Sequence, residues 1–234
     1  ALGMNWRYVA LPVPPGQIDA AVGGLAALGF RGANVTVPHK ESVLRALTGP
    51  EHTGAVAADA EALGAVNTLV MHQEAGEHPI VTGHNTDAAG FIGSLEAAGA
   101  TLEGIRAAVV GAGGAARAVV FGLMEAGAGA VTILNRNPER AEHLVADLTG
   151  GDIPGTDLRA VSLEEDRLVE IGRGADVLVN ATPVGMWPHA EKAIWPDKIP
   201  IPSDLTVFDL VYNPPATRLL RQARTSGARA IGGL

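Results

Sequence analysis

Residues 107–116 read AAVVGAGGAA, a short apolar run that leads directly into a glycine-rich loop. Four consecutive apolar residues predict a strand of a parallel sheet that is buried on both faces. Gly111, Gly113 and Ala116 fill the three positions of the G-x-G-x-x-G/A fingerprint, and an apolar helix to about Glu125 follows. Such a loop binds a pyrophosphate at the start of the helix. Glycine and alanine are frequent throughout the chain, so a purely structural turn is the alternative. The strand–loop–helix context favours the dinucleotide site.

Strand-like and helix-like segments alternate on both sides of this loop. Before it, we expect strands at 6–13, 33–37, 64–71 and 79–83, and helices at 18–28, from about residue 40, and at 87–98. After it, we expect strands at 130–135, 176–180 and 206–210, and helices at 138–148 and 216–225. This alternation predicts an α/β fold with a doubly wound parallel sheet and right-handed crossovers.

The βα pattern restarts between residues 87 and 104, which predicts two domains. Residues 1–86 would form an N-terminal α/β substrate domain, and 87–103 a connecting helix. Residues 104–215 would form a Rossmann-type nucleotide-binding domain. The last segment, 216–234, either stays with the second domain or returns to the first.

Composition excludes several function classes. The chain has 234 residues, 47% of them hydrophobic but only 4% aromatic, so its cores consist mainly of Ala, Val, Leu and Ile. A net charge of −8 disfavours nucleic acid and anionic membranes as partners. The absence of cysteine excludes disulfides, thiolate metal sites and cysteine nucleophiles. The seven histidines lie on separate segments, so we expect no metal. Without a spanning segment or a signal peptide, we expect a soluble, cytoplasmic protein.

The strand after the glycine loop indicates which cofactor binds. It ends in Asn135-Arg136 rather than in the Asp or Glu that holds the ribose 2′-hydroxyl of NAD. Arg140 follows one helical turn later, and two guanidiniums suit a 2′-phosphate. Each charged hydrogen bond contributes roughly 1.5–3 kcal/mol, so one or two imply about a ten- to thousand-fold preference for NADP. A solvated basic helix start, with Glu139 as ion-pair partner, is the alternative.

Lys40 is a candidate for proton transfer. It is one of only three lysines, and it closes the stretch Asn34-Val-Thr-Val-Pro-His-Lys40, at the carboxyl end of an expected strand and in the first helical turn. A cation is electrostatically disfavoured at a helix N-terminus, so helix stability does not account for it. Ligands of open α/β sheets bind at the carboxyl ends of strands, and an ammonium can donate a proton that Arg cannot release.

Asp87 and Asn67 are further polar candidates. Asp87 begins an expected helix and is the natural partner of Lys40, although a helix N-cap at Thr86 or Asp87 also explains the pattern. Asn67 interrupts the apolar run 65–70, where Asn is depleted. A buried amide needs hydrogen-bond partners, which a ligand hydroxyl, a bulge or an internal network can supply.

Together these segments resemble the shikimate dehydrogenase family, and the ordered set covers nearly the whole chain. The matching motifs are NVTVPHK at 34–40, GAVNT at 64–68, NTDxxG at 85–90, GAGGAARA at 111–118, NRN at 135–137, NATPVGM at 180–186 and DLVYNP at 209–214. The resemblance implies reversible, NADPH-dependent reduction of 3-dehydroshikimate to shikimate, a step of chorismate and aromatic amino-acid biosynthesis.

The resemblance also assigns roles to residues. The implied catalytic acid–base pair is Lys40 and Asp87. The implied substrate-binding residues are Thr36, Asn67, Asp87 and Tyr212. The implied cofactor-binding residues are Gly111, Ala112, Gly113, Gly114 and Ala115 at the pyrophosphate, Asn135, Arg136 and Arg140 at the adenosine phosphate, and Thr182 and Met186 near the nicotinamide. Shikimate or 3-dehydroshikimate would be the partner, with no nucleic acid and no membrane, and a homodimer is left open.

Two features of the family pattern are not found in these 234 residues. One is a first strand–helix unit that carries a Ser-x-Ser pair, and the other is a final helix with a Gln that contacts the ring. We therefore expect the chain to bind NADP more reliably than it turns over substrate. The alternatives are a quinate/shikimate dehydrogenase with relaxed specificity and a non-catalytic NADP-binding regulatory module. Lys40 together with Asp87 disfavours the regulatory module, because a sensor needs no proton donor.

Overall fold

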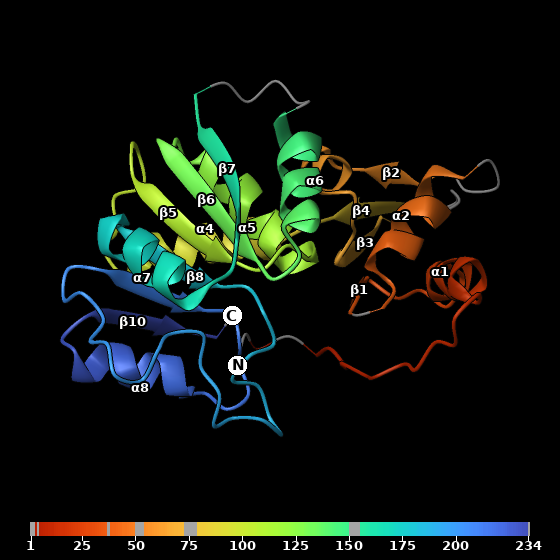
Figure 1. Ribbon diagram of the computed structural model, residues 1–234. Coiled ribbons are helices and arrows are strands. Elements are labelled where there is room, and N and C mark those ends of the chain that lie inside the picture. Colours follow the sequence, from red (N-terminus) through yellow and green to blue (C-terminus); the bar gives the residue numbers. More distant parts are fainter. Residues whose placement is uncertain are drawn as a thin grey trace. The chain divides into compact units, whose positions relative to one another are not determined.

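The computed structural model describes residues 3, 5–36, 38–49, 54–72, 79–149 and 155–233. The chain divides into two compact units, Ala1–Asn85 and Thr86–Leu234, and each is built around its own sheet (Figure 1). The expected α/β class is confirmed, because helices and strands alternate in both units. None of the helices in the described ranges is long and apolar enough to cross a membrane.

The smaller unit contains a mixed four-stranded sheet in the order β1-β3-β4-β2. Strand β3 pairs antiparallel with β1 and β4, and β2 pairs parallel with β4. Its elements are α1 (Ile18–Ala27), β1 (Gly32–Asn34), α2 (Lys40–Thr48), β2 (Ala55–Val56), α3 (Ala58–Leu63), β3 (Thr68–His72) and β4 (Ile80–His84). Helices α1 and α2 cover a core that includes Val22, Leu47, Val66 and Leu69. Their apolar side chains recur at helical spacing, which explains why these two segments fold as helices.

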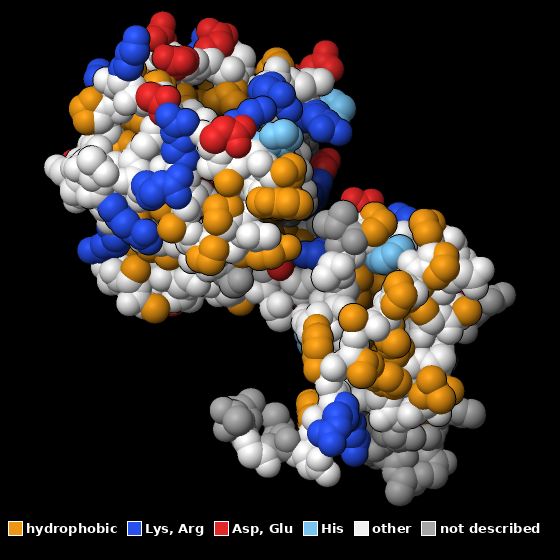
Figure 2. All heavy atoms as spheres, turned by 90° about the horizontal axis from the view of Figure 1, so that it is seen from below, with side chains coloured by type: hydrophobic (Ala, Val, Ile, Leu, Met, Phe, Trp, Pro, Cys, Tyr) orange, Lys and Arg blue, Asp and Glu red, His pale blue; other side chains and the backbone are white. Residues whose placement is uncertain are grey.

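The strand expected at residues 6–13 is wrong. Within the described part of the chain this segment pairs with no strand, and a strand needs a neighbour for its backbone hydrogen bonds. Most of its apolar side chains lie in solvent, with Tyr8 84% and Trp6 64% exposed, whereas Val13 packs on the core of this unit. The Tyr8 hydroxyl donates to Oδ1 of Asn34 at 3.2 Å, which ties the segment to β1. Figure 2 shows hydrophobic side chains spread over the visible face of this unit.

The larger unit contains six parallel strands in the order β10-β9-β8-β5-β6-β7. Counted along the chain, this is the doubly wound order of dinucleotide-binding folds. Its elements are α4 (Asp87–Ala97), β5 (Arg106–Val110), α5 (Gly114–Glu125), β6 (Ala130–Asn135), α6 (Pro138–Thr149), β7 (Asp157–Ser162), α7 (Glu165–Gly174), β8 (Val177–Asn180), β9 (Thr206–Asp209), α8 (Arg218–Thr225) and β10 (Arg229–Gly232).

Helices cover both faces of this sheet, which is why the central strand β5 is apolar from Ala107 to Val110. Val109 belongs to the core under α4, α5 and α6, whereas Val110 belongs to the core under α7 and α8. Phe91 of α4 meets Phe208 of β9 edge-on, with ring centroids 4.9 Å apart. Aromatic pairs favour this geometry, and it fixes α4 on the sheet.

The C-terminal segment lies in the larger unit. Helix α8 leads into β10, which pairs parallel with β9, so this segment is part of the sheet of the larger unit. Five short or edge elements, β2, α3, β7, α7 and β10, were not expected from the sequence.

Candidate functional site

The carboxyl ends of β5, β6, β8 and β9 lie at one edge of the parallel sheet. The direction of strand order reverses between β5 and β8, where Val110 is paired with Asn180. In open α/β sheets the crevice at this reversal binds the ligand. The cofactor-binding residues expected from the sequence lie at the ends of β5, β6 and β8, in the loops that follow these strands, or in the first turn of the next helix.

Gly111 is the residue at which the glycine loop turns. Its φ is +118°, a conformation that L side chains rarely adopt. Its N–H donates to the Leu134 carbonyl at 2.8 Å, and a Cβ here would lie 3.0 Å from the Ala181 carbonyl oxygen and 3.2 Å from Cγ2 of Thr182. The loop after β5 therefore packs directly on the loop after β8, and only glycine fits between them.

We expect Gly111→Ala to lower the free energy of unfolding by about 1–3 kcal/mol and to weaken nucleotide binding, because it adds backbone strain and a contact with Ala181. Gly155→Ala is the matched control. Gly155 has a similar φ of +114°, but a Cβ there meets nothing within 4 Å. Urea unfolding and calorimetric NADP titration of both variants test this. If Gly111→Ala had the same stability and the same affinity for NADP as the wild-type protein, this would contradict the close packing.

The start of α5 leaves room for an anion. Gly113 precedes the helix with extended backbone, at φ −101° and ψ −171°. A Cβ at Gly113 or Gly114 would meet nothing within 4 Å, and both residues and Ala115 are exposed. The first turn carries no acidic side chain. The N–H groups at the positive end of the helix thus face open space, which suits the pyrophosphate of a dinucleotide.

The end of β6 presents two arginines. Nδ2 of Asn135 donates to the Asn137 carbonyl at 2.8 Å, which shapes the turn into α6, and α6 begins at Pro138 as expected. Arg136 and Arg140 are exposed, and within the described ranges neither takes part in an ion pair. Glu139 is therefore not their ion-pair partner, and both guanidiniums are available to a ligand phosphate.

The loop after β8 is shaped by the buried side chain of Asn180. Its Oδ1 accepts hydrogen bonds from the hydroxyl and the N–H of Thr182, at 2.6 and 3.1 Å. Its Nδ2 donates to the Val184 carbonyl at 3.0 Å, and the Val184 N–H donates to the Thr182 hydroxyl at 3.2 Å. Met186, at the end of this loop, is 38% exposed. One amide thus defines the conformation of residues 181–184.

Asp209, the last residue of β9, lies beside this amide and is fully buried. Its Oδ1 accepts from Nδ2 of Asn180 at 2.9 Å and from the Val211 N–H at 3.1 Å, and its Oδ2 accepts from the Thr217 hydroxyl at 2.5 Å. Burial raises the pKa of the Asp209 carboxyl, and the three hydrogen bonds oppose the rise. Tyr212 follows, 68% exposed.

Sequence reasoning missed the roles of Asn180, Asp209 and Thr217. A signal existed for the first two, since each is a polar last residue of a strand whose preceding two residues are apolar. Which side chains they meet depends on strand pairing, because the Asn180–Asp209 bond joins residues 29 apart in the sequence.

In the smaller unit, backbone hydrogen bonds bring together Thr36, Lys40 and Asn67. The Val35 N–H donates to the Asn67 carbonyl at 2.7 Å, and the Val66 N–H donates to the Lys40 carbonyl at 3.0 Å. Thr36 lies one turn before Lys40, since its carbonyl accepts from the His39 N–H at 3.0 Å. Lys40 is half-buried and is the first residue of α2, as expected.

Asn67 lies just before β3 and not inside a strand, which corrects the expected strand at 64–71. It is 7% exposed, and its Oδ1 accepts from the Thr68 hydroxyl at 2.9 Å. Its backbone N–H donates to the His84 carbonyl at 3.0 Å, so the residue joins the ends of neighbouring strands. An internal hydrogen bond thus satisfies part of the hydrogen-bonding requirement of this buried amide.

Asp87 is the first residue of α4 in the larger unit, and Thr86 occupies the N-cap position. Two residues earlier, Asn85 ends the smaller unit. Nδ2 of Asn85 donates to the Ala65 carbonyl at 2.9 Å, and its N–H donates to Oδ2 of Asp59 at 3.3 Å. The chain is therefore anchored to the smaller unit immediately before Asp87. Among the described residues, no group of three His, Cys, Asp or Glu side chains is placed to hold a metal ion.

Comparisons with known proteins agree with these features. A family model described as the shikimate dehydrogenase substrate binding domain matches residues 1–69, and one described as shikimate / quinate 5-dehydrogenase matches 95–185. A shikimate dehydrogenase (NADP(+)) of Salinibacter ruber is 47% identical over 237 residues, which cover 100% of this chain and 78% of that relative.

Two solved structures are similar over most of the chain. Shikimate 5-dehydrogenase from Listeria monocytogenes, in complex with shikimate and NAD, superposes with a TM-score of 0.84 at 30% identity, covering 100% of this chain and 78% of that chain. Shikimate 5-dehydrogenase from Thermus thermophilus, in complex with NADP(H) and shikimate, has a TM-score of 0.74 at 38% identity and covers 93% of this chain and 72% of that chain.

Proposed function

Because the chain belongs to the shikimate dehydrogenase family, we propose that it interconverts shikimate and 3-dehydroshikimate with NADP as cofactor, in aromatic amino-acid biosynthesis. The observation that carries the cofactor assignment is the pair Arg136 and Arg140. Both are exposed after a strand of the doubly wound sheet, with no carboxylate paired to them in the described residues. The assignment of the substrate rests on the family, because similar relatives are NADP-dependent shikimate dehydrogenases.

The residues of the larger unit fit the cofactor. The open start of α5, at Gly113, Gly114 and Ala115, would take the pyrophosphate, and Gly111 and Ala112 would shape the turn before it. Asn135 would hold the turn from which Arg136 and Arg140 bind the 2′-phosphate. Thr182 and Met186 would border the nicotinamide, since their loop packs on Gly111 at the reversal of strand order.

Lys40 and Asp87 would carry out the acid–base chemistry. NADPH, when bound, would supply the hydride that reduces the carbonyl carbon of 3-dehydroshikimate. Lys40 would donate a proton to the carbonyl oxygen as it becomes a hydroxyl, and would accept that proton in the reverse direction. Asp87 would orient the ammonium toward the substrate oxygen. The proposal is supported by the half-buried position of Lys40 beside Asn67, and by the anchoring of the chain at Asn85, two residues before Asp87.

Substrate binding would involve polar side chains of both units. The Thr36 hydroxyl and the Asn67 amide suit ring hydroxyls, and Tyr212 presents an exposed phenol near the end of β9. A cytoplasmic location, a homodimer and the lack of a nucleic-acid partner stay predictions from the sequence.

Absorbance at the band of reduced nicotinamide tests the proposal, with shikimate as substrate and NADP⁺ or NAD⁺ as oxidant. We expect reduction of NADP⁺ with a higher kcat/KM than that of NAD⁺. Quinate in place of shikimate tests the relaxed-specificity alternative. Tight NADP⁺ binding without turnover of either acid would instead support a regulatory module.

A further inference from the structure

The loop that would border the nicotinamide, residues 181–186, depends on a polar network beneath it. Asn180 shapes the loop through Thr182 and Val184, and Asn180 is itself held by Asp209 at 2.9 Å. Asn180 and Asp209 are fully buried, at 0% exposure. They are also paired in register across β8 and β9. The network therefore connects the carboxyl ends of two central strands to the cofactor-facing loop.

Asp209 also connects this network to α8. Thr217 is the N-cap of α8: its hydroxyl oxygen accepts from the Leu220 N–H at 3.3 Å while it donates to Oδ2 of Asp209 at 2.5 Å. The Val211 N–H, donating to Oδ1, fixes the start of the β9–α8 segment. A single carboxylate thus accepts from three segments, namely the end of β8, the residues after β9 and the start of α8.

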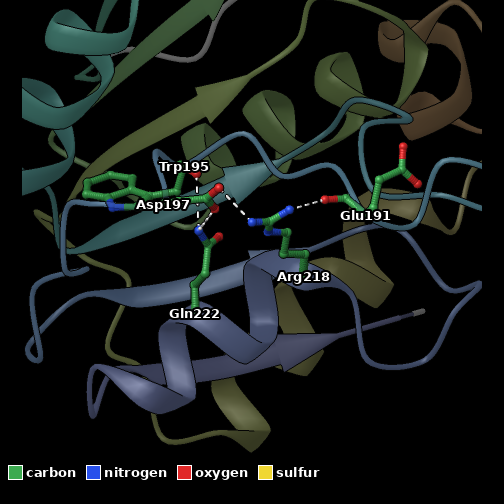
Figure 3. Close-up of polar contacts among 5 residues, drawn as sticks. All are labelled: Glu191, Trp195, Asp197, Arg218 and Gln222. Atoms are coloured by element: carbon green, nitrogen blue, oxygen red, sulfur yellow. Dashed lines mark hydrogen bonds and ion pairs between the residues drawn. The ribbon is translucent and has the colours of Figure 1, made fainter.

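The start of α8 is held on a second side. Figure 3 shows Arg218 and Gln222 reaching from α8 toward the segment that carries Glu191 and Asp197. Arg218 donates to Oδ2 of Asp197 at 2.6 Å and to the Glu191 carbonyl at 2.5 Å, and Gln222 donates to Oδ1 of Asp197 at 3.0 Å. These contacts attach the start of α8 to residues 191–197, which follow the loop 181–186 along the chain. Thr217, at the N-cap of α8, is therefore held in place as a hydrogen-bond partner of Asp209.

A buried carboxylate with neutral partners costs stability relative to a well-packed apolar residue. Fold stability alone therefore does not account for Asp209, whose neighbours Val207 and Phe208 are apolar and fully buried. Its three hydrogen bonds instead specify one conformation of the segments that meet at the cofactor crevice.

We propose that Asp209 is a positioning residue for hydride transfer: through Asn180 and Thr217 it holds residues 181–186 against Gly111 in the conformation that receives the nicotinamide. The inference rests on the proposed function, since it assigns the nicotinamide half of NADP to this loop. It predicts that loss of the network disturbs the nicotinamide end of the site and spares the adenosine end, which Arg136 and Arg140 bind.

Asp209→Ala tests the proposal through two readouts, kcat for shikimate oxidation and the Kd of 2′,5′-ADP, a fragment that lacks the nicotinamide. We expect kcat to fall about 10- to 100-fold, because small misplacements of reacting groups have effects of this size. The Kd of 2′,5′-ADP should stay within about twofold of the wild-type value. Asp209→Asn should restore most of the rate, because its amide oxygen can keep the bonds from Asn180 and Val211, while its amide nitrogen donates to Thr217.

Asp176→Ala is the matched control, since Asp176 stands at the amino end of β8, where its Oδ2 accepts from the Arg106 N–H at 2.8 Å. It should leave kcat unchanged. If Asp209→Ala does not fold, Thr217→Val with Thr217→Ser as its rescue gives the same comparison. A wild-type kcat in Asp209→Ala, or equal losses of kcat and 2′,5′-ADP affinity, would overturn the proposal. If the wild-type protein does not oxidise shikimate, the proposed function fails. The ratio of NADP⁺ to 2′,5′-ADP affinity in the variants then tests the positioning role, with an unchanged ratio counting against it.

Discussion

We expect Lys40→Ala to lower kcat for shikimate oxidation by about 10²–10⁴-fold, the usual contribution of a general acid–base group. The affinity for NADP⁺ should stay within about twofold of wild type, because the expected cofactor residues all belong to the larger unit, whereas Lys40 begins α2 in the smaller one. Steady-state kinetics together with calorimetric NADP⁺ titration measure both quantities.

Two further variants make this result specific. Lys40→Arg keeps the positive charge but cannot release a proton at neutral pH, so it should be nearly as slow as Lys40→Ala. Lys198→Ala removes an exposed lysine of the larger unit and should leave kcat unchanged. A Lys40→Ala variant that retained the wild-type rate would support the non-catalytic alternative.

We expect replacement of Arg136 and Arg140 together by glutamine to raise the Kd of NADP⁺ about ten- to thousand-fold, since each guanidinium–phosphate bond contributes roughly 1.5–3 kcal/mol. The Kd of NAD⁺ should change little, because NAD⁺ has no 2′-phosphate for these side chains to bind. The preference for NADP⁺ over NAD⁺ should therefore fall. Titration of each cofactor gives the two Kd values whose ratio measures this preference.

Arg173→Gln is a suitable control for this pair, because Arg173 is an exposed arginine in the last turn of α7 and its loss changes net charge without touching the end of β6. It should leave both Kd values near wild type. If the double variant lost NADP⁺ and NAD⁺ affinity by the same factor, the two arginines would support the fold of the site and not recognition of the 2′-phosphate.

The parts of the fold that the sequence predicts are those with strong local patterns. The run 107–110 has no polar residue and is β5, buried between two helical layers. Gly111 and Gly113 mark the turn into α5, and Pro138 marks the start of α6. Lys40 and Asp87 begin helices where the sequence places them. In each case the periodicity of one segment, or a residue at its end, is sufficient to predict the helix or strand.

The rest depends on contacts between distant segments. Residues 6–13 have the alternation of a strand but no strand partner in the described chain, so pattern alone gives the wrong state. Residues of β7 and β10 form strands because they pair with β6 and β9. The sequence does not reveal this pairing. The bond between Asn180 and Asp209 likewise exists only because β8 and β9 are adjacent.

The central claim is that Lys40 and Asp87 act as one acid–base unit on the same substrate oxygen. A double-mutant cycle on kcat, with Lys40→Ala, Asp87→Asn and the double variant, measures this directly, because residues that act as a unit have non-additive effects. We predict that the double variant is no more than about tenfold slower than the slower single variant. Losses that multiply, so that the double variant shows the full product of both single effects, would contradict the account.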